Sequence, residues 1–136
     1  DRDDEVPKRS WKKSLGVWYI KTTPGYYLQP RGSDVIPSTP SMKKAWWNIM
    51  LYGDGKVSIK SQTGRFLCAH ANGHVSLEKH YLECELWTPG AIDDGSWTYT
   101  SYNGRFLSVG NGEVTTIPHN LAWEHFWLEK VGQGSE

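Results

Sequence analysis

The chain has 136 residues, with 15 Lys plus Arg balanced by 15 Asp plus Glu, so its formal net charge at pH 7 is zero. This length predicts one domain. The absence of a basic surplus argues against a dedicated nucleic-acid binder, which must neutralise phosphates. No apolar run approaches the roughly 18 residues that a transmembrane helix needs. The 8 Trp, 7 Tyr and 14 Gly are typical of short strands joined by tight turns.

In chain order, the first segment is polar and dense in charge. We interpret residues 1–14 as a solvated N-terminal tail and residues 132–136 as a C-terminal tail, which leaves residues 15–131 for the domain. Only two cysteines are present, Cys68 and Cys84, and secreted disulfide scaffolds usually carry more. The sequence therefore favours two buried free thiols over one bridge. It slightly favours the cytoplasm over secretion, and leaves the compartment open.

The segment between the tails repeats one pattern three times. The repeated positions are a glycine, a leucine three residues later and a valine further on: Gly25, Leu28 and Val35; Gly64, Leu67 and Val75; Gly104, Leu107 and Val114. The glycines are separated by 39 and then 40 residues. A fixed period of this size indicates an architecture built from repeated units.

Each repeat is predicted to hold four short strands. The strands expected in the second repeat are residues 56–61, 65–70, 74–79 and 83–88. Asn72-Gly73 and Asn111-Gly112 are hairpin signals, and Arg31-Gly32 takes that place in the first repeat. Three units of four strands are too few for a propeller. They fit an all-β fold of the β-trefoil type, with pseudo-threefold symmetry and a six-stranded barrel capped by three hairpins. The repeated Leu and Val should fill the barrel.

The tryptophans divide into two sets. Five fall at strand positions that correspond between repeats, and we expect them to be structural: Trp18, Trp47, Trp87, Trp97 and Trp127. Trp11, Trp46 and Trp123 are less constrained by the repeat.

No group of residues in the sequence supports catalysis or metal binding. Cys68 and His70 are two residues apart, but no third group orients them as a nucleophile and base. His70 and His74 flank one turn, whereas a metal site needs three or four converging ligands. Asp93-Asp94-Gly95 fits a turn better than a calcium loop. We therefore expect no enzyme activity, no metal and no cofactor.

The loops that follow the third strand of each repeat are the predicted binding surface, because loops on a rigid scaffold usually carry binding residues. Their candidate residues are Lys43, Lys44 and Trp46; Lys79, His80 and Tyr81; and His119 and Asn120. An aromatic ring beside cations can stack on a sugar or anchor a protein partner.

Residues 64–69, 72–75 and 85–87 (Gly-Arg-Phe-Leu-Cys-Ala, Asn-Gly-His-Val and Glu-Leu-Trp) resemble the repeat of fascin-like β-trefoils. So does the third repeat, beginning at Gly104-Arg105-Phe106-Leu107, and the likeness covers residues 17–131. Fascins cross-link actin filaments. The resemblance therefore implies a non-catalytic module that binds or crosslinks actin filaments. We expect the protein to be a monomer or weak dimer.

Glycan-binding lectins of the β-trefoil type are the alternative. The Gln-x-Trp signature of ricin-type lectins does not occur here. Fibroblast growth factors share the fold and bind heparin, but residues 108–118 hold Glu113 and no Lys or Arg. The sequence thus leaves actin filaments and glycans as the two partner classes.

Overall fold

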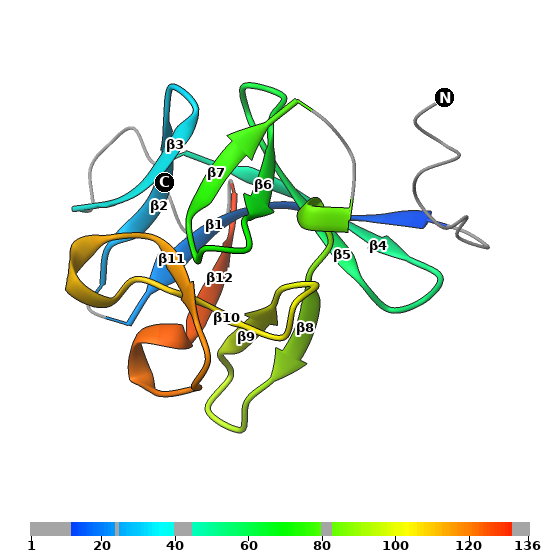
Figure 1. The fold of residues 1–136 in the computed structure, drawn as a ribbon. Helices are drawn as coiled ribbons and strands as arrows, with labels where there is room; N and C mark the ends of the chain where they lie inside the picture. The colour runs from blue at the N-terminus through cyan, green and yellow to red at the C-terminus, as the bar shows by residue number, and fades with distance from the viewer. Residues whose placement is uncertain (1–11, 24, 40–44, 80–82, 132–136) are drawn as a thin grey trace.

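The computed structural model describes residues 12–23, 25–39, 45–79 and 83–131. Within these ranges it contains twelve strands in three groups of four, with three short 3-10 turns (Figure 1). This confirms the predicted all-β trefoil. In the described part of the chain, no helical segment has the length and hydrophobicity needed to cross a bilayer.

The first repeat contains β1 (Lys12–Thr22), β2 (Tyr27–Arg31), β3 (Asp34–Ser38) and β4 (Trp47–Tyr52). The second contains β5 (Val57–Ser61), β6 (Phe66–Ala69), β7 (Val75–Glu78), the 3-10 turn η2 (Glu83–Glu85) and β8 (Thr88–Ala91). The third contains β9 (Trp97–Thr100), β10 (Phe106–Ser108), η3 (Gly110–Gly112), β11 (Thr115–Ile117), η4 (Ala122–Glu124) and β12 (Phe126–Lys130).

Six of these strands close into the barrel. Antiparallel pairing joins β1 to β4, β4 to β5, β8 to β9, β9 to β12 and β12 back to β1. The ring is completed between β5 and β8, where Val57 and Trp87 exchange both backbone hydrogen bonds at 2.8 Å. Closure removes the open edges that invite strand addition. The hairpins β2–β3, β6–β7 and β10–β11 form the cap.

The repeated glycines form the same turn in each repeat. Gly25, Gly64 and Gly104 have φ of +95°, +88° and +81°. Each donates its N–H to the carbonyl three residues earlier, at 2.9, 3.0 and 3.0 Å. A side chain strains backbone in this region, so the repeat retains glycine at the turn.

The repeated apolar residues meet in the core, as predicted. All three repeat leucines are completely buried, and the three repeat valines are buried with them. Trp47 and Trp87 are also completely buried, and their indole N–H groups donate to the carbonyls of Leu28 and Leu67, each at 3.0 Å.

The third repeat fills this Trp position differently from the prediction. Phe126 pairs with Trp97 as Trp47 pairs with Trp18, so Phe126 is the equivalent of Trp47. Phe126 is completely buried, whereas Trp127 is only half-buried. The prediction for Trp127 is therefore wrong by one residue.

Two element boundaries also differ from the sequence prediction. Residues 83–85 form η2, and the fourth strand of the second repeat begins at Thr88. The first strand begins at Lys12 and pairs with β4 from its first residue, so it extends into the segment interpreted as a tail.

Cys68 and Cys84 form a disulfide, with their Cα atoms 4.9 Å apart. The prediction of two free thiols is therefore wrong. Cys68 lies on β6 and Cys84 lies in η2, so the bond fixes the 3-10 turn against the strand. Cys84 falls on the strand predicted at residues 83–88, which gives no reason to pair it with Cys68.

Candidate binding site

The third repeat contains a pocket of about 440 Å³ beside the β10–β11 hairpin. We call it the third-repeat pocket. Its lining combines polar groups with apolar side chains, among them Ser108, Glu113, Thr115, His119, Leu121 and Trp123. Leu121 is 63% exposed and Trp123 is 46% exposed. Large apolar groups this exposed beside polar ones are typical of ligand-contacting surfaces.

A buried carboxylate supports the wall of this pocket. Glu124 is almost completely buried, and its two oxygens accept hydrogen bonds from the Leu121 backbone N–H and the Ser108 hydroxyl, both at 2.6 Å. Ser108 Oγ in turn accepts the Gly110 N–H at 3.1 Å. A carboxylate out of water is stable only when hydrogen-bonded in this way. Glu124 therefore holds the loop in place.

Further hydrogen bonds fix the rest of the loop. The Val109 N–H donates to the Trp123 carbonyl at 3.2 Å. The Thr23 hydroxyl, from the distant β1–β2 turn, contacts the carbonyls of Ala122 and His125. These bonds constrain the backbone while the Trp123 side chain stays accessible. A loop backbone held in this way loses little conformational freedom when a ligand binds.

The structure places four of the predicted binding residues. His119 lines the third-repeat pocket, and Asn120 Oδ1 lies 3.0 Å from His125 Nε2. Trp46 lies just before β4, 36% exposed, with its backbone N–H donating to Gln62. Lys79 is exposed directly after β7. Lys43, Lys44, His80 and Tyr81 lie outside the described residues.

Only part of the predicted surface coincides with a pocket. His119 lines the third-repeat pocket, and neither Trp46 nor Lys79 joins it there. The sequence reasoning missed Leu121 and Trp123 as its most exposed apolar members. The available signal was a departure from the repeat. Counting back from the equivalent residues Phe126 and Trp87, Trp123 stands where the second repeat has Cys84.

The second repeat differs at the corresponding place. Cys68 corresponds to Ser108, and Glu85 corresponds to Glu124. Both glutamates are buried, but the disulfide occupies the side of the turn where the third repeat exposes Trp123. The repeats therefore do not present equivalent binding sites.

The histidine pair and the two cysteines make contacts with neighbouring side chains. The rings of His70 and His74 stack with centroids 5.5 Å apart, and His70 Nε2 lies 2.7 Å from Ser76 Oγ. Within the described ranges, the one group of three metal-ligating residues contains Cys68 and Cys84. Their sulfurs are joined in the disulfide and are not available as thiolates.

The Asp93-Asp94-Gly95 segment forms a turn, as the sequence suggested. Asp94 Oδ1 accepts hydrogen bonds from the Ser96 hydroxyl at 2.6 Å and the Ser96 N–H at 2.9 Å. These bonds lower the pKa of Asp94. Gly95 has a φ of +93°, which the turn requires.

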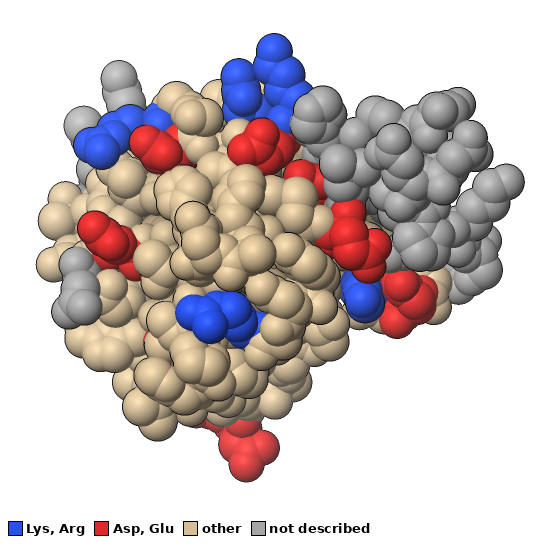
Figure 2. Space-filling view, viewed as in Figure 1, with Lys and Arg blue, Asp and Glu red and all other residues tan. Residues whose placement is uncertain are grey.

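Charge is sparse over one face of the molecule. Figure 2, in the orientation of Figure 1, shows separate Lys, Arg, Asp and Glu side chains on a mainly uncharged surface around β8 to β11. This face therefore offers a mainly uncharged surface with no large patch of one charge.

Comparisons with known proteins add to this geometry. A scan against protein-family models and a search of curated proteins give no match. A search of solved structures finds SeviL bound to asialo-GM1 saccharide, with a TM-score of 0.75 and 19% sequence identity. The match covers 85% of this chain and 98% of that chain.

This likeness shows a shared fold over nearly the whole of the SeviL chain. The fold is that of a β-trefoil, in agreement with the strand pairing. The similarity does not single out fascin-like trefoils, so the fascin-like assignment remains a prediction from the repeat motif.

Proposed function

We propose that this protein is a non-catalytic glycan-binding module, and that the third-repeat pocket holds the saccharide. The observation that carries the proposal is Trp123, an exposed aromatic residue on a hydrogen-bonded loop that lines a pocket. Its backbone is fixed by the hydrogen bond from the Val109 N–H to the Trp123 carbonyl and by the hydrogen bond from the Leu121 N–H to the Glu124 carboxylate.

The pocket offers the two kinds of contact that a sugar needs. A pyranose ring has a face of C–H groups, which packs on an indole ring, and a rim of hydroxyls, which require hydrogen-bond partners. Trp123 and Leu121 supply the apolar surface, while His119, Thr115 and Glu113 supply polar groups. The Glu124 carboxylate accepts hydrogen bonds from Leu121 and Ser108, so it shapes the pocket.

The structural neighbour supports glycan binding over actin-filament binding. SeviL has the same fold and is described in complex with a saccharide. No described feature of the chain favours actin filaments in a comparable way. A crosslinker also needs two filament contacts, whereas the third-repeat pocket is a single site.

The test compares saccharide binding by two variants. A glycan array identifies a bound saccharide, and calorimetry measures its affinity for the wild type, Trp123→Ala and Tyr102→Ala. Tyr102 is the matched control, because it is a 43% exposed aromatic residue outside the pocket. We expect Trp123→Ala to weaken binding about tenfold or more, as aromatic anchors cost about 2 kcal/mol when truncated.

Equal affinities for the two variants would show that the third-repeat pocket is not the saccharide site. A filament co-sedimentation assay with the same proteins tests the actin prediction. If the protein pellets with filaments and binds no saccharide on the array, the glycan proposal is wrong and the actin prediction is supported.

A further inference from the structure

The outer face of the barrel repeats one arrangement at three places. Each place has a residue on the first strand of a repeat, an aromatic residue paired with it on the second strand, and a residue beside them on the preceding fourth strand. The three sets are Lys21, Tyr27 and Glu129; Lys60, Phe66 and Met50; and Thr100, Phe106 and Gly90.

In the first set, the chain supplies its own anion. Glu129 Oε2 lies 3.8 Å from Lys21 Nζ, and Glu129 Oε1 accepts the Tyr27 hydroxyl at 2.8 Å. The lysine at this position is therefore paired with a carboxylate from the neighbouring strand.

In the second set, that carboxylate is missing. Met50 takes the place of Glu129, and Phe66 takes the place of Tyr27. Lys60 Nζ lies 5.4 Å from the centre of the Phe66 ring. Within the described part of the chain, no Asp or Glu forms an ion pair with Lys60.

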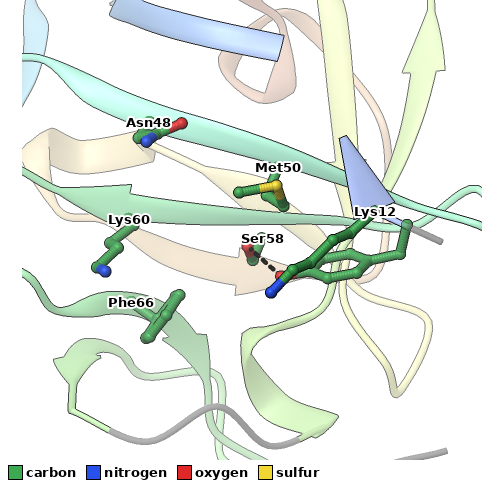
Figure 3. Close-up of a pocket in the computed structure, with 7 residues that line it drawn as sticks. Lys12, Asn48, Met50, Ser58, Lys60 and Phe66 are labelled. Carbon is green, nitrogen blue, oxygen red and sulfur yellow. Dashed lines mark hydrogen bonds between the residues drawn. The ribbon is translucent and has the colours of Figure 1, made fainter. Parts of the chain in front are cut away.

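A pocket of about 290 Å³ opens at this place, and we call it the Lys60 slot. Besides Lys60, Phe66 and Met50, its lining includes Lys12, Asn48 and Ser58. Figure 3 shows the two lysines on opposite sides of Met50 and Ser58. The slot thus has a cationic group at either side of a floor that is partly apolar and partly hydroxyl-bearing.

The floor of the Lys60 slot is preformed. The hydroxyls of Tyr52 and Ser58 lie 2.9 Å apart, and both residues are buried. Asn48, which is opposite Lys60 in the strand register, accepts a hydrogen bond from Ser14 Oγ at 3.3 Å. Its amide N–H₂ group can donate to a ligand.

The third set has the same strand positions but differs in charge and in space. There the residues are Thr100, Phe106 and Gly90, which carry no charge. A Cβ on Gly90 would lie 2.6 Å from Thr98 Oγ1, so the neighbouring strand already fills the space.

We propose that the Lys60 slot binds the carboxylate of an acidic saccharide, with the ligand carboxylate in the place that Glu129 takes beside Lys21. Lys60 and Lys12 attract the anion, the Met50 and Phe66 side chains pack on the C–H face of the sugar, and Asn48 hydrogen-bonds a hydroxyl. This site is separate from the third-repeat pocket, so each can fail without the other.

The experiment titrates ¹⁵N-labelled protein with glucuronate at low salt, because salt screens exposed charge pairs. Glucose and acetate are the matched probes, one without the carboxylate and one without the sugar. We expect glucuronate to shift the amide signals of β4 to β6, with glucose and acetate binding about tenfold or more weakly. Equal binding of acetate, or no binding of glucuronate, overturns the proposal.

Three variants locate the site. Met50→Glu places a carboxylate where Glu129 stands in the first set, so it should pair with Lys60 and weaken glucuronate binding about tenfold. Lys60→Gln should do the same by removing the cation. Lys21→Gln is the matched control and should leave glucuronate binding unchanged.

Thermal unfolding checks that each variant is folded. If Met50→Glu does not fold, the test relies on Lys60→Gln. Unchanged affinity in the folded Met50→Glu or Lys60→Gln protein overturns the proposal, as does an equal loss in Lys21→Gln. In the titration, the amide signals of β4 to β6 report on the Lys60 slot and those of β10 and β11 report on the third-repeat pocket, which separates this result from the test of that pocket.

Discussion

Single side chains decide how closely the three repeats match. The same barrel position holds Trp47, Trp87 and Phe126, and all three are completely buried. Leu77 is paired with Leu67 in the β6–β7 hairpin, but its N–H donates to the Ser33 carbonyl. The Leu67 carbonyl therefore accepts its hydrogen bond from the Trp87 indole N–H. A buried carbonyl without a donor is costly. The indole therefore contributes a hydrogen bond as well as buried area.

Substituting Trp87→Phe tests that hydrogen bond. The ring remains large and apolar, but the Leu67 carbonyl loses its indole donor, so we expect the free energy of unfolding to fall by about 1–3 kcal/mol. Urea unfolding gives the value. Trp46→Phe is the control at an exposed indole and should change stability by no more than about 0.5 kcal/mol. Equal effects at both positions would mean that the indole bond contributes no stability.

The residues that line the third-repeat pocket show which of them the sequence reasoning named and which it did not. His119 was predicted because its loop follows the third strand of a repeat. Trp123 was not, because its exposure depends on Glu124 folding the chain into η4. The shift from Trp127 to Phe126 has a similar origin. Adjacent rings satisfy the period equally well, and only the strand register chooses between them.

At the scale of elements, the disulfide distinguishes the second repeat. It links β6 to η2 across a sequence separation of 16 residues, at the place where the third repeat uses the Ser108–Glu124 hydrogen bond. Two chemically different links thus hold the same turn.

Replacing both cysteines, in Cys68→Ala/Cys84→Ala, should lower the free energy of unfolding by about 3 kcal/mol, because a bridge closing a loop of this length restricts the unfolded chain by about that amount. Guanidinium unfolding with and without dithiothreitol measures it. Reduction should destabilise the wild type and leave the double variant unchanged. A wild type that is indifferent to dithiothreitol would contradict the assigned bond.

The whole molecule explains why the fold was predictable and the sites were not. Threefold closure requires the same turn and a large buried apolar side chain at equivalent positions of each repeat, so the turn glycines Gly25, Gly64 and Gly104 keep their period. Polar positions on the outside carry no such constraint. Lys21 and Lys60 occupy equivalent strand positions, yet one is paired with Glu129 and the other lies beside Met50. Each candidate site is thus a departure from the repeat.

Alkaline pH should destabilise the molecule through two buried tyrosines. Burial raises the pKa of Tyr99, and burial with the Glu129 hydrogen bond and charge raises the pKa of Tyr27 to about 12. Their contribution to stability is complete below pH 10 and is lost as the pH rises, because the unfolded chain then releases protons that the folded chain retains. Urea unfolding at pH 9 and pH 11 should show this loss, and Tyr99→Phe should reduce it.

Tyr102→Phe removes an exposed hydroxyl and should keep the wild-type loss. Equal slopes in all three proteins would mean that Tyr99 ionises as readily in the folded chain as in the unfolded one.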